Sequence, residues 1–465
     1  MSSTRPMNHQ RLWADLAWLP DGWQRHVLLE IDSAGRWRSV QAGVPCPADA
    51  LRLNGPALPG LVNAHSHAHQ RAFAGLAEHV DQPGDNFWSW RDRMYRVADS
   101  ITPASLHAIA TQLYGEMLEG GYTQVCEFHY LAHTAGEPAT EQAHALSQAV
   151  VDAASEVGIG LTLLPVLYER AGFTQPALRP DQQRFHRDAE AVMAAQRHVA
   201  AQGHISLNAG VAVHSLRAAR PASLHRLRAL CEGQDLPIHI HVAEQTAEVD
   251  DCLQATGQRP VQWLAAEGLL DARWQLVHAT HVTPEEIEAT GRAGSGVVIC
   301  PTTEANLGDG LTDLPGWLRA GTPLSVGSDS QVTRCWREEL RWLEYGQRLQ
   351  WRQRNVAMSH PPAAGATASR LWQAVLAGGA AAAGQTSWGL QVGARADLLV
   401  APATDAALAG IPTSRTLDAL VFSSPGQAWS DVMVAGRWTL RDGERPGKAQ
   451  HQARFTEVMR NLWGE

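Results

Sequence analysis

Two histidines separated by one residue follow an apolar run near the start of this 465-residue chain. The run covers residues 58–64, and His65 and His67 come directly after it. If the run forms a strand, both imidazoles point to the same side, because side chains in a strand alternate with period two. Two imidazoles on the same side at the end of a strand form half of a binding site for a divalent metal ion.

Further candidate metal ligands lie at the ends of later apolar runs. They are His239, His241, His278 and Asp329. Three neutral imidazoles and one carboxylate, with a place left for water, suit one catalytic Zn²⁺ ion, and Fe²⁺ or Mn²⁺ would accept similar ligands. Such an ion lowers the pKa of its water towards about 7 and supplies hydroxide at neutral pH.

Spacing alone does not decide between His239 and His241, because both lie on the same face of one run. His241 is nearer to the end of the run and precedes Glu244 by three residues, so we favour His241 as the ligand. A carboxylate at Glu244 could carry a proton from a nucleophilic water to a leaving nitrogen. His278 and Asp329 could orient and deprotonate that water. Other histidines are expected to act on the substrate or indirectly: His69, His129, His214 and His281.

Eight apolar, β-branched runs must bring these side chains together. The runs cover residues 58–64, 122–128, 160–167, 205–213, 237–242, 274–278, 296–300 and 323–327. Amphipathic, alanine-rich segments between them include 141–157, 222–232 and 261–268. This alternation predicts an α/β fold, a closed (β/α)8 barrel of TIM type with its functional residues at the carboxyl ends of the strands. An open doubly wound sheet is disfavoured, because no Gly-x-Gly-x-x-Gly motif opens a helix.

The two ends of the chain contain short strand-like pieces separated by turns. These pieces are 27–31, 37–40, 396–400 and 432–437. They predict a small β-sandwich built from both termini. The expected division is 1–57 and 391–465 for the sandwich and 58–390 for the barrel.

Composition argues against several kinds of chemistry and partner. The net charge of −9 argues against a surface for nucleic acid or anionic membranes. The only lysine is Lys448, so the central region offers no Schiff-base, phosphate-loop or metal-bridging carbamylated lysine. Six scattered cysteines form no Cys-x-x-Cys pair, and the polar residues 1–10 lack the apolar core of a signal peptide. With no run long enough to span a bilayer, we expect a cytoplasmic protein with reduced thiols.

Together these residues resemble the amidohydrolase superfamily, specifically its deaminase branch with one metal ion. The shared motifs are PGLVNAHSH at 59–67, HVAE at 241–244, His278, Ser328-Asp329 and GARADLLV at 393–400. The resemblance implies four metal ligands: His65, His67, His241 and Asp329. It also implies that Glu244 is the proton shuttle, that His278 holds the hydrolytic water and that the protein is a homodimer. The absence of a barrel lysine agrees with the one-metal branch.

Loop motifs narrow the resemblance to enzymes that deiminate N-formimidoyl-L-glutamate in histidine breakdown. The motifs are HAHQRAF at 67–73, FWSWR at 87–91, Tyr130 and HSLR at 214–217. A substrate with two carboxylates requires cationic, fork-shaped donors, which Arg91 and Arg217 could supply. Hydrogen bonds could come from three further side chains: Gln70, Tyr130 and His214.

The expected reaction is hydrolysis of N-formimidoyl-L-glutamate, a small dicarboxylate, to N-formyl-L-glutamate and ammonia. The main alternative keeps the fold and the metal but acts on a ring such as guanine or an adenosine derivative. For a ring we would expect aromatic stacking and amide groups rather than two arginines. Release of formamide instead of ammonia would use nearly the same site. A non-catalytic scaffold is a remote alternative, because it would have lost the ligands that this sequence retains.

Overall fold

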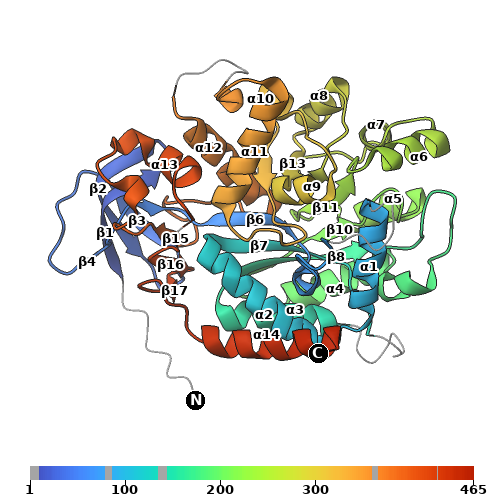
Figure 1. Cartoon of the computed structure of the whole chain (residues 1–465), viewed down its shortest axis with the longest axis horizontal. Coiled ribbons are helices and arrows are strands. Elements are labelled where there is room, and N and C mark those ends of the chain that lie inside the picture. Colours follow the sequence, from blue (N-terminus) through green and yellow to red (C-terminus); the bar gives the residue numbers. More distant parts are fainter. Residues whose placement is uncertain (1–9, 79–85, 135–143, 359–364, 427, 465) are drawn as a thin grey trace.

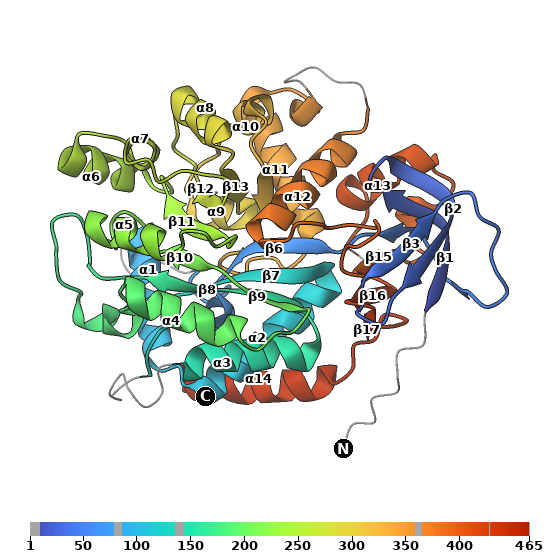
Figure 2. The same ribbon diagram turned by 180° about the vertical axis from the view of Figure 1, so that it is seen from behind.

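The computed structural model describes residues 10–78, 86–134, 144–358, 365–426 and 428–464. Two sheets organise this part of the chain, a nine-stranded parallel barrel sheet and an eight-stranded sheet made from both ends (Figures 1 and 2). The predicted fold class, a TIM-type barrel with a β-rich unit built from the termini, is confirmed.

The barrel strands follow the order β14-β13-β12-β11-β10-β8-β7-β6, with β9 beside β8. Their bounds are β6 (Leu61–Ser66), β7 (Tyr122–His129), β8 (Gly160–Leu167), β9 (Leu207–Ala209), β10 (Val211–Val213), β11 (Ile238–Val242), β12 (Trp274–His278), β13 (Gly296–Ile299) and β14 (Leu324–Val326). Each predicted run overlaps at least one of these strands. The run 205–213 is broken at Gly210, where a Cβ would lie 2.5 Å from the Pro237 carbonyl oxygen.

Helices surround the barrel strands, and several begin with a proline, whose fixed φ suits the first helical position. They are α1 (Phe87–Asp99), α2 (Pro103–Gly120), α3 (Ala145–Val157), α4 (Ala189–Ala200), α5 (Pro221–Leu230), α6 (Thr246–Thr256), α7 (Pro260–Ala266), α8 (Pro284–Ala293), α9 (Pro301–Leu307), α10 (Leu314–Ala320), α11 (Trp336–Trp351) and α12 (Thr367–Ala382). The three predicted helical segments correspond to α3, α5 and α7. Residues 141–143 of the first segment lie outside the described residues.

The eight-stranded sheet joins the two ends of the chain. Its strands are β1 (Arg11–Leu19), β2 (Gly22–Ile31), β3 (Trp37–Gln41), β4 (Leu51–Arg52), β5 (Ala57–Leu58), β15 (Leu398–Val400), β16 (Asp431–Val434) and β17 (Arg437–Leu440). The antiparallel pair of β5 and β15 makes the junction. Leu58 therefore belongs to this sheet rather than to the first barrel strand, and Pro59-Gly60 separates the two, because proline has no N–H for a strand ladder.

A buried ion pair fastens this sheet to the barrel. Arg395 pairs with Asp397 at 2.7 Å, and both side chains are almost fully buried. The same guanidinium donates to Gln124 Oε1 at 2.7 Å and to the Thr123 carbonyl at 3.1 Å, both in β7. The sheet is thus held against a barrel strand by charge-assisted hydrogen bonds.

The remaining helices follow β15. They are α13 (Thr416–Phe422) and α14 (Lys448–Trp463). Helix α14 runs along α2 and α3 on the barrel (Figures 1 and 2), where Trp463 Nε1 donates to the Ala72 carbonyl at 3.2 Å. The division at residues 57 and 390 stays a proposal.

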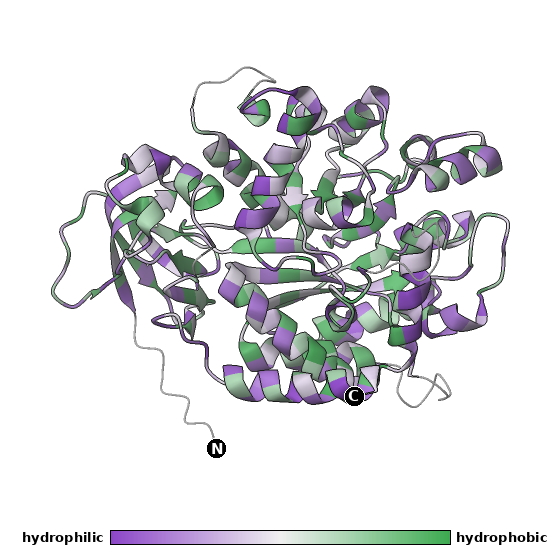
Figure 3. Ribbon diagram, in the orientation of Figure 1, coloured by the Kyte–Doolittle hydropathy of each residue, from purple (hydrophilic) through white to green (hydrophobic). Residues whose placement is uncertain are grey.

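Hydrophobic residues line the barrel strands, whereas the surrounding helices alternate between hydrophobic and hydrophilic positions (Figure 3). This is the pattern of strands buried on both faces and of helices with one face in water. Among the helices of the described residues, none has both the length and the apolar character needed to cross a membrane.

The barrel closes where the chain after β14 meets β6. The backbone N–H of Asp329 donates to the His65 carbonyl at 3.0 Å. The Asn63 side chain accepts from the Ser328 backbone N–H at 3.0 Å and donates to the Ser328 hydroxyl at 2.7 Å. A Cβ at Gly327 would lie only 2.6 Å from the Cβ of His65 and 2.8 Å from its backbone N and O. Only glycine permits this approach.

We expect Gly327→Ala to lower the free energy of unfolding by about 1–3 kcal/mol, because the added methyl group forces the closing strands apart. Chemical denaturation followed by tryptophan fluorescence measures this change. The matched control is Gly172→Ala, since nothing lies within 4 Å of a Cβ added there. Equal stability of the two variants would contradict the proposed role of Gly327.

Candidate metal centre and active-site pocket

Three imidazoles and one carboxylate meet at the closure of the barrel. The Nε2 atom of His65 lies 3.1 Å from that of His67 and 3.0 Å from that of His241. Asp329 Oδ1 lies 3.5 Å from His65 Nε2 and 3.3 Å from His67 Nε2. Donors about 2.1 Å from a tetrahedral ion are separated from one another by roughly 3.4 Å. The separations of His65, His67 and Asp329, and of His65 from His241, are close to this value, and two candidate metal-binding groups share His65: one with His67 and Asp329, the other with His241 and His278.

Strand geometry and hydrogen bonds direct the imidazoles into this cluster. His65 lies in β6 and His67 directly follows it, and their Nε2 atoms face each other, as the sequence predicted for imidazoles on one side. The Nδ1–H of His67 donates to the Phe128 carbonyl at 2.9 Å, which leaves its Nε2 lone pair facing the cluster. His239 is excluded, because its Nε2 donates to the Ala382 carbonyl at 2.8 Å. Of the two histidines in β11, His241 is the one whose Nε2 lies beside the cluster, next to His65 Nε2.

The backbone turns sharply where three barrel strands end. Ala243, His278 and Asp329 have φ values of 52°, 68° and 44°, in the left-handed region that non-glycine residues seldom adopt. Each costs on the order of 1–3 kcal/mol. These turns direct the His278 and Asp329 side chains into the mouth of the barrel.

Two further ionisable side chains lie beside the cluster. His278 Nε2 is 3.6 Å from Glu244 Oε1 and 3.8 Å from Asp329 Oδ2. Burial raises the pKa of Glu244 to about 7, which suits a group that exchanges protons at neutral pH. Burial lowers the pKa of His278, but Glu244, Glu304 and Asp329 outweigh it and raise the value to about 10. A bound cation would oppose this rise by repelling a second positive charge.

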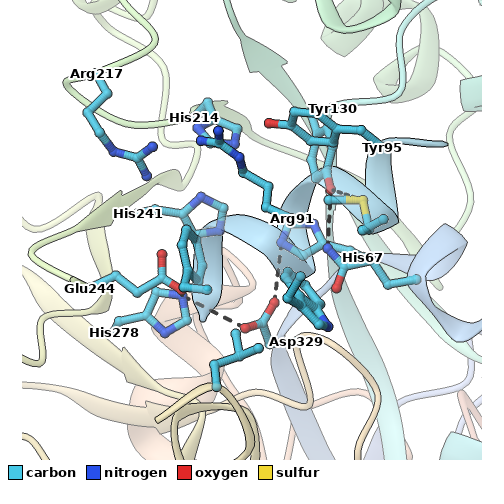
Figure 4. Close-up of a pocket in the computed structure, with 15 residues that line it drawn as sticks. His67, Arg91, Tyr95, Tyr130, His214, Arg217, His241, Glu244, His278 and Asp329 are labelled. Atoms are coloured by element: carbon cyan, nitrogen blue, oxygen red, sulfur yellow. Dashed lines mark hydrogen bonds and ion pairs between the residues drawn. The ribbon is translucent and has the colours of Figure 1, made fainter. Parts of the chain in front are cut away.

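A pocket of about 470 Å³, counting the space at its mouth, opens above the cluster (Figure 4). The predicted site residues that line it are His67, Gln70, Arg91, Tyr130, His214, Arg217, His241, Glu244, His278 and Asp329. His65 lies beneath the pocket and is fully buried. The structure therefore brings all the predicted site residues to one place, while their roles stay proposals. Sequence inspection missed several apolar or aromatic lining residues: Phe87, Trp90, Met94, Tyr95 and Leu307.

Two guanidinium groups line the pocket (Figure 4), Arg91 from α1 and Arg217 from the loop after β10. Their Cζ atoms lie 4.6 Å and 5.5 Å, respectively, from the centre of the Trp88 ring. The Nε atoms of both are buried and lack a hydrogen-bond partner within the described part of the chain. Two cations on one ring repel each other, so a ligand with two carboxylates would stabilise this arrangement.

Polar side chains complete the pocket beside the arginines. The Tyr130 hydroxyl accepts from Gln70 Nε2 at 3.2 Å and lies 3.0 Å from His69 Nε2. The His214 ring stands 5.1 Å from the His241 ring, close to the candidate metal ligands. His129 and His281 do not line the pocket.

Buried acids behind the pocket were also missed. Glu127 accepts hydrogen bonds from the Ser66 hydroxyl at 2.8 Å and the Ala68 backbone N–H at 2.5 Å, which holds the chain on both sides of His67. Burial and the nearby Glu244 raise the pKa of Asp309 to about 9. Glu304 lies against His278. An acid inside the apolar run 122–128 could have revealed Glu127, but no spacing marks the other two.

This fold and site define the class of the protein, a TIM-barrel hydrolase with a candidate metal-binding group of histidines and one aspartate. The Amidohydrolase family model matches residues 57–439, and the chain belongs to this family. The family predicted from the sequence motifs is confirmed.

Curated relatives and solved structures agree with this membership. The chain is 44% identical over 456 residues to formimidoylglutamate deiminase of Pseudomonas aeruginosa, which covers 97% of this chain and 99% of the relative. It is 29% identical to 8-oxoguanine deaminase of the same organism over 90% of this chain and 89% of the relative. An amidohydrolase structure from Brucella melitensis superposes with a TM-score of 0.91 at 38% identity, covering 98% of this chain and 100% of that one. An adenosine deaminase structure from Xanthomonas campestris with bound zinc shares the fold, with a TM-score of 0.79 at 21% identity over 98% and 99% of the two chains.

Replacing the two histidines of β11 separately tests which of them binds metal. We expect His241→Asn to weaken binding of a divalent ion by at least about 10-fold, because one donor of four is lost. His239→Asn should keep its metal content even if it lowers stability, since the Nε2 of His239 is directed to the Ala382 carbonyl and away from the cluster. Metal analysis of both proteins after dialysis against the same zinc buffer measures the difference. Loss of metal from His239→Asn alone would reverse the assignment.

Proposed function

We propose that this chain hydrolyses N-formimidoyl-L-glutamate to N-formyl-L-glutamate and ammonia. The observation that carries the proposal is the pair Arg91 and Arg217, whose guanidinium groups line the pocket above the histidine and aspartate cluster. Glutamate derivatives carry two carboxylates, which two arginines bind with paired hydrogen bonds. The 44% identity to formimidoylglutamate deiminase over nearly the whole chain supports the same substrate.

We assign the four clustered donors, His65, His67, His241 and Asp329, to one divalent ion and propose Zn²⁺. The separations of 3.0–3.5 Å between His65 and each of the other three donors and between His67 and Asp329, together with the neutral imidazoles, support the assignment. When bound, the ion lowers the pKa of a water and supplies hydroxide at neutral pH.

The chain's own residues then bind the substrate and hold its reacting carbon in place. Arg91 and Arg217 bind the two carboxylates, while Gln70, Tyr130 and His214 add hydrogen bonds. This fixes the formimidoyl group next to Glu244 and His278, and correct placement accounts for a large share of the rate enhancement.

Glu244 moves the proton that the reaction requires. It accepts a proton from the attacking water and delivers it to the nitrogen that leaves, in keeping with its pKa of about 7. His278 and Asp329 hold the water through hydrogen bonds. A C–O bond forms at the formimidoyl carbon and the C–N bond to the terminal nitrogen breaks, so R–NH–CH=NH and H₂O give R–NH–CHO and NH₃.

A second candidate is a ring aminohydrolase. The aromatic lining of Phe87, Trp90 and Tyr95 could stack on a purine, and one relative is an 8-oxoguanine deaminase. A neutral purine would bring no carboxylate to the two arginines that line the pocket, so we rank it second.

We also propose a cytoplasmic homodimer. The six cysteines are free thiols, which suits a reducing compartment. Leu349 on α11 is 75% exposed and Trp342 on the same helix is 45% exposed, a surface that a second copy could cover.

Ammonia release from N-formimidoyl-L-glutamate by the zinc-loaded protein tests the reaction. We expect chelator-sensitive ammonia in equal amounts with N-formylglutamate, because one C–N bond breaks in each turnover. Guanine, adenosine and 8-oxoguanine are assayed in parallel. Formamide with glutamate would indicate the other leaving group, and ammonia from a purine alone would favour the ring aminohydrolase.

The arginine pair has its own test. We expect Arg217→Gln to raise the KM for N-formimidoyl-L-glutamate on the order of 10- to 100-fold, because a charge-assisted hydrogen bond is lost. The matched control is Arg226→Gln, since Arg226 is on the surface of α5 and pairs with Glu190 at 2.7 Å, away from the pocket. If both variants keep the wild-type KM in steady-state kinetics, Arg217 does not bind the substrate.

A further inference from the structure

We propose that Glu304 is a positioning residue that fixes the tautomer of His278 by holding its proton on Nδ1. The inference rests on the proposed function, in which His278 holds the attacking water through Nε2. No sequence motif pointed to Glu304, and it is not among the residues that line the pocket above the cluster.

The contacts of Glu304 show how it would act. It lies in the first turn of α9 and is 2% exposed. Its Oε1 accepts from the Cys300 backbone N–H at 2.9 Å and lies 3.4 Å from His278 Nδ1. A carboxylate oxygen only accepts hydrogen bonds, so Nδ1 must carry the proton. The backbone contact keeps the carboxylate from following any movement of the imidazole.

The other ring nitrogen of His278, Nε2, faces the acidic side chains of the proposed reaction site. Nε2 is directed towards Glu244 and Asp329, at 3.6 Å and 3.8 Å. A cation bound at the cluster disfavours a second positive charge on His278, and the neutral imidazole then carries one proton, on either nitrogen. The hydrogen bond at one nitrogen decides which of the two is protonated. With Nδ1–H bound to Glu304, Nε2 alone is left to accept a hydrogen bond from water.

The strained backbone at this position makes a side-chain anchor more important. His278 has a φ of 68° and the following Ala279 a φ of 46°. Side chains held on such turns depend on surrounding contacts for their orientation. On the Nδ1 side of the ring, Glu304 supplies that contact.

Glu339 on α11 offers a matched control, because it contacts α9, the helix that carries Glu304. It is fully buried and binds the start of α9, accepting from the Thr302 backbone N–H at 3.1 Å and from the Thr302 hydroxyl at 2.7 Å. It therefore resembles Glu304 in burial and in its contact with α9. Within the described part of the chain, the Glu339 carboxylate binds Thr302 and makes no hydrogen bond to His278. Loss of Glu339 measures the structural cost of removing a buried acid from this region.

Nitrogen NMR of histidine-labelled, zinc-loaded protein reads the tautomer directly. We expect His278, identified by the signal lost in His278→Asn, to be protonated on Nδ1 in the wild type. Glu304→Met should abolish that preference, whereas Glu304→Gln should keep it, because the amide oxygen still accepts from Nδ1–H. Glu339→Met should leave it unchanged. A wild-type His278 with its single proton on Nε2 would overturn the inference without the need for any variant to fold.

Kinetics supplies the second readout. We expect Glu304→Met to lower kcat by about 10- to 100-fold with little change in KM, because the imidazole is misdirected while the arginines still bind substrate. Glu304→Gln should recover most of the activity, and Glu339→Met should stay near wild type. Equal kcat values for Glu304→Met and Glu339→Met would contradict the positioning role. Failure of wild-type protein to release ammonia would instead reject the proposed function, because the NMR result does not depend on substrate.

Discussion

The closure of the barrel between β6 and the chain after β14 is the constraint on which the site depends. Asp329 bonds to the His65 carbonyl through its backbone and approaches the imidazoles of His65 and His67 through its side chain. One short segment thus completes both the sheet and the cluster of donors. The absence of a side chain at Gly327 sets the distance, since a Cβ there would collide with His65. An enzyme built in this way loses its site whenever the barrel opens.

Burial then determines the electrostatics of the site. The pKa of His65 falls to about 3 because burial disfavours its charged form, so the imidazole is neutral at physiological pH. Burial would raise the pKa of Asp329, but its contacts with His65 and the other histidines hold it well below its ordinary value. Neutral imidazoles beside an ionised carboxylate form a group that a divalent cation stabilises. The same low-dielectric surroundings bring the pKa of Glu244 close to neutrality.

The substrate side of the pocket is built differently from the metal side. The clustered donors come from barrel strands or lie directly after them, whereas Arg91 lies on α1 and Arg217 on the loop after β10. Trp88 holds both guanidinium groups against its ring. Rigid strands can fix donors to within the tolerance of a metal ion, while loops and an outer helix can change the accepted substrate without disturbing that cluster. This separation explains how one family can contain relatives named for a linear amidine and for a purine.

The sequence by itself determined the features that depend on local periodicity. Alternation along a strand put His65 and His67 on one side, and eight apolar runs with helices between them predicted the barrel and the edge at which functional residues gather. It also marked the arginines, Glu244 and Asp329 through their motifs. Only the tertiary structure excluded His239, which bonds to the distant Ala382, and placed Glu304 against His278. Those contacts join segments far apart in the chain, and their distances exist only once the barrel has closed.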